Sequence, residues 1–202
     1  MQPIPLPPRN LASIPISTVQ VAPSRLYRIS RFNFGEPFFG RSAANRFDDP
    51  GRTRSKRFGT CYLGFSLEVA IAETILHDEM PVKGQFNVAA QEIEDRHCVR
   101  FQGQPLTLVD LTGTALKALI GTGAISTTMP YDVPQRWSRA LHRHPVSADG
   151  ILYMSRHVNN DRAVVVFDRA RAKLGAAEFM PLAATKGTLR ALMNLRVSAR
   201  FA

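Results

Sequence analysis

Three polar side chains stand inside or beside otherwise apolar stretches of this chain. Arg28 interrupts one such stretch, Glu73 interrupts a second, and Ser155 directly follows a third, residues 150–154. A buried charge or hydroxyl is costly unless it is paired or hydrogen-bonded. These three groups come from distant parts of the sequence, and a cation, a carboxylate and a hydroxyl together predict a small polar site.

Glu73 carries the strongest signal of the three. It is the only charged residue between Val69 and Leu76. Drawn as a helix, this segment has apolar residues on both sides, so we expect it to be covered all round. A carboxylate on such a helix needs a partner or a role. Two interpretations stay open: a structural ion pair, for which Arg28 is a candidate, or a catalytic carboxylate.

The elements that must position these residues alternate irregularly along the chain. The strand-like segments are residues 25–31, 60–65, 85–93, 106–111, 151–153 and 163–167. The helix-like segments are residues 66–77 with Ser66 as N-cap, 113–120, and 131–142 with Pro134 in its first turn. This irregular order favours an α+β fold, a compact mixed sheet core with flanking helices, over a doubly wound parallel sheet.

Length and composition predict one domain behind a proline-rich arm. Residues 1–24 hold six prolines and almost no charge, which favours an extended arm that lies across the body or a partner. Residues 25–202 then form a single catalytic domain, in which residues 32–57 are a long loop. No stretch approaches the roughly 18 apolar residues of a spanning helix, so we expect a cytoplasmic protein.

The net charge of +10 attracts anionic partners such as a nucleotide, a nucleic acid or an acidic protein. The densest basic run, residues 52–57, lacks the aromatic residues of a base-stacking surface and is read as a solvated loop. Cys61 and Cys98 have no partners at metal-ligand spacing. We therefore expect reduced thiols, with neither a disulfide framework nor a zinc site.

Common catalytic templates do not fit. No Gly-x-Ser-x-Gly turn surrounds Ser155, and neither a P-loop nor a Gly-x-Gly-x-x-Gly turn is present. The histidines at 77, 142 and 144 match no common metal spacing, so no metal site is expected. What remains is a set of arginines for an anion, an aromatic ring for stacking, a carboxylate and a hydroxyl.

These residues resemble the RES-domain family, which is named for its Arg, Glu and Ser. Three landmarks match in order and spacing: Leu26-Tyr27-Arg28, then Asn45-Arg46-Phe47-Asp48 followed by residues 62–73, then residues 149–155. Together they extend from about Tyr27 to Phe167. The chain departs from the common Gly-Gly-Arg-Trp/Phe-Asn turn of the family, because Ala44 and Asn45 precede Arg46 here and Asp48 follows Phe47.

The resemblance implies a fold similar to ADP-ribosyltransferase toxins and a function as the toxin of a type II toxin–antitoxin pair. In this family NAD is the substrate and its nicotinamide–ribose bond is broken, by hydrolysis or by phosphorolysis with inorganic phosphate as co-substrate. No further cofactor is expected. The resemblance also implies a cognate antitoxin with a helix-turn-helix DNA-binding domain, whose C-terminal part blocks the cleft, so that DNA is bound only through the antitoxin.

Roles for individual residues follow from the same resemblance. We expect Glu73 to stabilise the oxocarbenium-like transition state, with Arg28 and Ser155 completing the catalytic set. We expect NAD to be bound by Tyr27, Arg28, Arg46, Tyr62 and Ser155. In this assignment the two arginines hold pyrophosphate or the attacking phosphate, Tyr62 stacks on nicotinamide, and Ser155 hydrogen-bonds the ribose or the amide.

Simpler roles and other functions stay open. Tyr62 could be a core aromatic residue of a strand, and Ser155 could close a turn. A basic toxin that binds DNA or RNA is the main alternative function, and it predicts affinity that falls steeply with salt. Transfer of ADP-ribose to a protein would use the same cleft and would differ only in its products.

Overall fold

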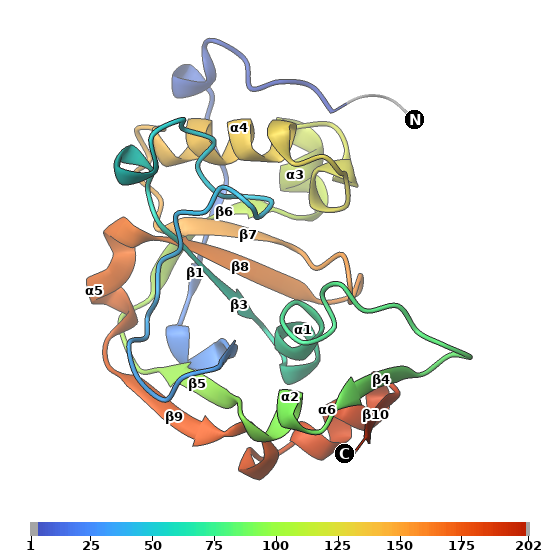
Figure 1. Cartoon of the computed structure of the whole chain (residues 1–202). Helices are drawn as coiled ribbons and strands as arrows, with labels where there is room; N and C mark the ends of the chain where they lie inside the picture. Colours follow the sequence, from blue (N-terminus) through green and yellow to red (C-terminus); the bar gives the residue numbers. More distant parts are fainter. Residues whose placement is uncertain (1–3, 201–202) are drawn as a thin grey trace.

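The computed structural model describes residues 4–200 and has a five-stranded mixed sheet at its centre (Figure 1). The strand order is β1-β6-β7-β8-β3, in which β6 and β7 run parallel and the other neighbours run antiparallel. The strands are β1 (Thr18–Val21), β3 (Thr60–Gly64), β6 (Leu106–Leu111), β7 (Gly150–Met154) and β8 (Arg162–Phe167).

Both faces of this sheet are covered, which explains its continuous apolar strands. On β8, Val165 and Phe167 point into one core while Val164 and Val166 point into another. Successive side chains of a strand lie on opposite faces, so a strand buried on both faces must be apolar at every position. The run of residues 163–167 has this composition.

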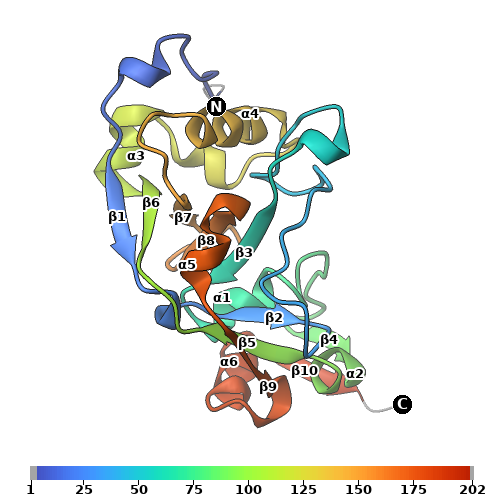
Figure 2. The same cartoon turned by 90° about the vertical axis from the view of Figure 1, so that its left-hand side faces the viewer.

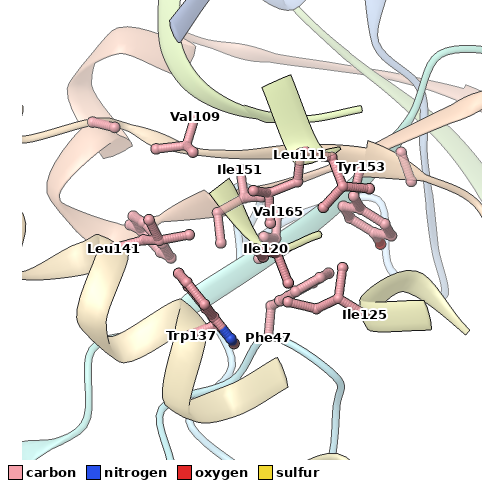
Figure 3. Packing of buried hydrophobic residues seen from close by; sticks show 14 of the residues in the cluster. Phe47, Val109, Leu111, Ile120, Ile125, Trp137, Leu141, Ile151, Tyr153 and Val165 are labelled. Carbon is pink, nitrogen blue, oxygen red and sulfur yellow. The ribbon is translucent and has the colours of Figure 1, made fainter. Parts of the chain in front are cut away.

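Helices α3 (Gly113–Leu119) and α4 (Asp132–His142) cover the first face (Figures 1 and 3). Trp137 and Leu141 of α4 are fully buried against Ile151 of the sheet. This packing holds α4 and the chain that precedes it over the end of β7.

A second sheet covers the other face (Figure 2). It is antiparallel, has the order β2-β5-β9, and consists of β2 (Arg28–Ser30), β5 (His97–Phe101) and β9 (Ala177–Pro181). Short helices α2 (Gln91–Glu94) and α5 (Arg171–Leu174) flank it.

Helix α1 (Leu67–Ala72) links the two sheets and packs on α6 (Thr188–Asn194), beside the parallel pair of β4 (Phe86–Ala89) and β10 (Val197–Arg200). Ser66 caps α1, as predicted, by accepting a hydrogen bond from the backbone N–H of Val69. The helix ends at Ala72, earlier than the sequence predicted, so that Glu73 is its C-terminal cap.

The predicted α+β class, with a mixed sheet core and flanking helices, is confirmed. The segment predicted as one strand over residues 85–93 is wrong in its second half, where the chain turns into α2. Strands β5, β9 and β10 were not predicted. Within the proline-rich arm, β1 pairs antiparallel with β6 as an edge strand, so this part is packed into the sheet.

Among residues 4–200, no helix combines the length and the apolar character that a membrane crossing requires.

Candidate active site

The predicted polar residues surround one pocket of about 360 Å³ between α1, β3 and the segment that precedes α4. Small-molecule sites commonly have volumes of this order. Tyr27, Arg28, Arg46, Tyr62 and Glu73 all line it, although they come from four separate segments of the chain. Other lining residues include Asn45, Gly64, Thr74, His77, Asp78, Ser126, Tyr131, Tyr153 and Arg156.

Ser155 lies behind Glu73 and fixes its carboxylate. The Ser155 hydroxyl donates a hydrogen bond of 2.7 Å to Glu73 Oε1 and accepts two from the backbone N–H groups of His157 and Val158. Its exposure is only 1%. Because its donor and acceptors are engaged, Ser155 positions the carboxylate, whose other oxygen, Oε2, lies 3.9 Å from His157 Nε2.

Helix α1 ends directly before Glu73. Gly64 at the end of β3 lets this strand approach α1 closely, since an added Cβ there would lie 2.8 Å from the backbone nitrogen of Ala70 and 2.9 Å from Val69. The strand end and the helix therefore form one wall, from which the side chain of Glu73 reaches the pocket.

Arg28 pairs with Glu36 rather than with Glu73. Its Nε donates to Glu36 Oε2 at 2.8 Å and its Nη1 donates to the carbonyl of Tyr62 at 3.1 Å. The Glu36 side chain is only 3% exposed and that of Arg28 is 19% exposed, so this ion pair is largely shielded from solvent. The long loop of residues 32–57 thus supplies the partner of one pocket arginine.

Arg46, from the same loop, is held differently. Its Nη1 donates to the carbonyl oxygens of Thr128 (2.6 Å) and Ile125 (3.4 Å), and its guanidinium lies 4.7 Å from the ring centroid of Tyr131. Its Nη2 is buried and has no partner among the described residues. Burial lowers the pKa of Arg46 from its ordinary value, and the nearby Arg156 lowers it further. A bound anion would relieve both costs.

Tyr62 and Tyr27 line the pocket and are also held in place by contacts outside it. The Tyr62 hydroxyl donates to Asp48 Oδ1 at 3.1 Å and accepts from the backbone N–H of Phe47 at 3.0 Å. Burial raises the pKa of Tyr62 well above its ordinary value, so this hydroxyl is protonated. Tyr27 stacks under the guanidinium of Arg100, 3.9 Å from its ring centroid.

Sequence reasoning missed His77, His157 and Arg156, which also gather at Glu73. His157 Nε2 lies 3.9 Å from Glu73 Oε2, and the rings of His77 and His157 are 5.3 Å apart. Burial lowers the pKa of His157, an effect that Glu73 partly offsets. Spacing along the chain places His77 four residues after Glu73 and Arg156-His157 directly after Ser155, but it could not show that these two segments meet.

Glu73, His77 and His157 could each offer one ligand atom to a metal, since these atoms lie within 4.8 Å of one another. However, His157 Nε2 already accepts a hydrogen bond of 2.9 Å from Arg156 Nε. A guanidinium in this position repels a cation and favours an anion.

Comparisons with known proteins identify the family of this chain. The model of the RES domain matches residues 25–185. The chain therefore belongs to the RES-domain family. It is 35% identical over 102 residues to the "Probable toxin y4kH" of Sinorhizobium fredii strain NBRC 101917 / NGR234, a match that covers 50% of this chain and 79% of that protein.

Its fold is also similar to a chain of the crystal structure of the M. tuberculosis MbcT-MbcA toxin-antitoxin complex. The TM-score is 0.55 at 15% sequence identity, and the superposition covers 82% of this chain and 88% of that chain. At this identity the likeness concerns the fold, and it extends well beyond the five-stranded sheet.

Proposed function

We propose that this chain is the toxin of a toxin–antitoxin pair and that it depletes NAD by cleaving the nicotinamide–ribose bond. Membership of the RES-domain family, the relative named as a probable toxin and the fold shared with a toxin-antitoxin complex support the toxin assignment. The observation that carries the chemistry is the Glu73 carboxylate, fixed by Ser155 in a pocket that Arg46 also lines.

In the proposed reaction the bond between the ribose anomeric carbon and the nicotinamide nitrogen breaks, and its electron pair passes to the nicotinamide ring. Nicotinamide is cationic in NAD and leaves without protonation, so orientation and charge placement supply the catalysis. The ribose carbon becomes oxocarbenium-like, and Glu73 stabilises that positive charge. Water then gives ADP-ribose, whereas inorganic phosphate gives ADP-ribose 1″-phosphate.

The remaining pocket residues would bind the substrate. Arg46 is suited to a pyrophosphate oxygen because its unpartnered Nη2 can form a charge-assisted hydrogen bond. Arg28 is already paired with Glu36, so its contribution is to shape the wall and to offer its remaining donors. Tyr62 and Tyr27 present aromatic faces on which a flat nicotinamide ring can stack.

The same proposal includes a cognate antitoxin. Its helix-turn-helix domain would bind DNA, and its C-terminal part would block the pocket in the cytoplasm of the host cell. The net charge of +10 suits an acidic blocking segment, since opposite charges raise the rate of association.

Replacement of Glu73 by glutamine tests the role of the carboxylate. The amide keeps the size of the side chain and an acceptor for Ser155 but loses the negative charge. We expect kcat for nicotinamide release to fall by about a hundredfold or more, with NAD binding retained. Near-normal turnover in a folded Glu73→Gln protein would remove Glu73 from the mechanism. Glu79→Gln, an exposed change outside the pocket lining, is the matched control.

A further inference from the structure

Arg156 is a pocket arginine whose charge is not neutralised by any carboxylate within ion-pair distance among residues 4–200. Its Nε contacts His157 Nε2 at 2.9 Å, its Nη2 lies 3.5 Å from His77 Nε2, and its Nη1 lies 3.4 Å from the sulfur of Met129. A guanidinium carries five donors and forms its strongest bonds with paired oxyanions. Two ring nitrogens and a thioether are weak substitutes.

The two histidines orient Arg156 without cancelling its charge. Burial lowers the pKa of His157, so its imidazole is neutral near pH 7 and can accept a hydrogen bond at Nε2. The bond from Arg156 Nε implies the tautomer that carries its proton on Nδ1. The guanidinium is thereby held at the pocket wall as a full cation.

Two arginines with unused capacity thus face one cavity. Arg46 has a buried Nη2 without a partner in the described part of the chain, and Arg156 has no carboxylate. Arg46 lies close enough to Glu73 for opposite charges to interact, and Arg156 disfavours the charged form of Arg46. An anion between Glu73 and these arginines would remove the repulsion between the two cations.

We propose that Arg156, oriented by His77 and His157, forms a phosphate-oxyanion subsite beside Glu73 and determines whether phosphate can act as the nucleophile. This inference rests on the proposed function. The position favours free orthophosphate over the pyrophosphate of NAD, because His157 Nε2 lies only 3.9 Å from the carboxylate that would stabilise the reacting carbon.

The corresponding step is balanced without any further reactant. An oxygen of the phosphate dianion forms a bond to the ribose anomeric carbon while the carbon–nitrogen bond breaks and its electron pair leaves with nicotinamide. The products are neutral nicotinamide and ADP-ribose 1″-phosphate. Arg156 would hold the attacking dianion against the repulsion of Glu73, a role that water, being neutral, does not require.

Arg156→Gln tests the subsite by steady-state kinetics with NAD and inorganic phosphate varied separately. The substitution keeps a hydrogen-bond donor but removes the charge. We expect KM for phosphate to rise about tenfold or more, with KM for NAD within about twofold, as for loss of a charged hydrogen bond. A rise in KM for NAD alone would overturn the assignment to free phosphate and identify the occupant as the pyrophosphate of NAD. Unchanged constants for both would overturn the subsite itself.

Two further variants serve as controls for the Arg156→Gln measurement. Arg190→Ala removes one positive charge from an exposed position of α6 outside the pocket lining, and we expect it to leave both constants unchanged. Arg156→Lys keeps the charge but loses the planar fork, so its KM for phosphate should lie between those of the wild type and Arg156→Gln. If Arg156→Gln does not fold, Arg156→Lys decides: a KM for phosphate equal to the wild-type value would then contradict the subsite.

Binding measured without turnover separates this inference from the proposed function. Titration of the wild-type protein with inorganic phosphate, followed through the histidine ring signals in NMR spectra, should shift the signals of His77 and His157. The shift should disappear in Arg156→Gln. If NAD is never cleaved, the proposed function fails, but these titrations still decide the subsite. If neither phosphate nor pyrophosphate shifts the histidine signals, the proposed subsite at Arg156 is contradicted.

Discussion

At the residue scale, the site depends on which partner each charged group finds. Arg28 takes Glu36 from the long loop, which leaves Glu73 free of an arginine and bonded instead to a neutral hydroxyl. The hydrogen bond from Ser155 engages one carboxylate oxygen, Oε1. An ion pair between Arg28 and Glu73, considered on sequence grounds, would have cancelled the charge that the proposed chemistry needs.

Ser155→Ala tests whether that hydroxyl positions Glu73. We expect kcat to fall about tenfold to a hundredfold, because a hydrogen bond to a charged group contributes about 1.5–3 kcal/mol. KM for NAD should stay nearly constant, since the hydroxyl is buried behind the carboxylate. Kinetics of nicotinamide release give both constants. A rise in KM with unchanged kcat would indicate instead that Ser155 binds the substrate, and Ser13→Ala, at an exposed position, is the control.

His142 should make stability sensitive to acid. Its ring stacks on the ring of Phe58, with 4.1 Å between the two centroids, and burial lowers its pKa from 6.5 to about 4. Between these values the unfolded chain binds a proton that the folded chain does not, so this contribution is complete above pH 6.5 and is lost as the pH falls towards 4. His142→Phe keeps a stacked ring and should lose less stability over this range in urea titrations. Parallel pH profiles for the two proteins would contradict this role.

At the element scale, close backbone approaches decide where the chain needs glycine. Gly150 is the first residue of the central strand β7. A Cβ at Gly150 would lie 2.1 Å from the carbonyl oxygen of Val165 on β8. The Asp149 carboxylate accepts hydrogen bonds from the backbone N–H of Thr107 and from Lys173, which fixes the entry of the strand.

Gly150→Ala should therefore lower the free energy of unfolding by about 3 kcal/mol, near the upper end of the usual cost of overpacking. Urea denaturation of the purified proteins measures this change. Gly123→Ala is the matched control, because a Cβ at Gly123 would meet no atom within 4 Å. Equal stability of the Gly150→Ala and Gly123→Ala proteins would show that β7 and β8 can separate without cost.

The elements that sequence predicted well are those with one clear period or a capping signal. Strands β3, β6, β7 and β8 of the central sheet and helix α4 are apolar in patterns that only one secondary structure fits, and Ser66 marks the start of α1. Residues 85–93 read in sequence as one strand. The stretch is so short that its apolar residues, such as Val88 and Ile93, fit both the period of a strand and that of a helix. Strand β5 was missed because His97 and Arg100 interrupt its apolar positions.

At the scale of the whole molecule, the pocket exists because two sheets and α1 meet beside the end of β7. Five of the residues that line it, Tyr27, Arg28, Arg46, Tyr62 and Glu73, were predicted from the sequence, since unusual polar residues in apolar elements are visible in one dimension. The sequence could not name their partners. The contacts of Ser155 with Glu73 and of Arg28 with Glu36, and the cluster of His77, His157 and Arg156, depend on the packing of segments that carry no pairing signal.

The N-terminal arm belongs to the same packed unit. Leu11 is buried in the core that contains Trp137, and the indole N–H of Trp137 donates to the carbonyl of Pro5 at 2.7 Å. A chain that begins at Ser17 should therefore expose its single tryptophan, shift the fluorescence maximum to longer wavelength and lower Tm. An unchanged emission spectrum and Tm would show that the arm contributes nothing to the fold.

Whether the pocket cleaves NAD is decided by incubating the purified protein with NAD, with and without inorganic phosphate, and resolving the products by mass. We expect free nicotinamide with ADP-ribose, or with ADP-ribose 1″-phosphate when phosphate is present, and Glu73→Gln should yield little of either. ADP-ribose found on protein would identify the activity as protein ADP-ribosylation. Intact NAD at high concentrations of the free protein would contradict the proposed cleavage of NAD and favour a toxin that binds nucleic acid.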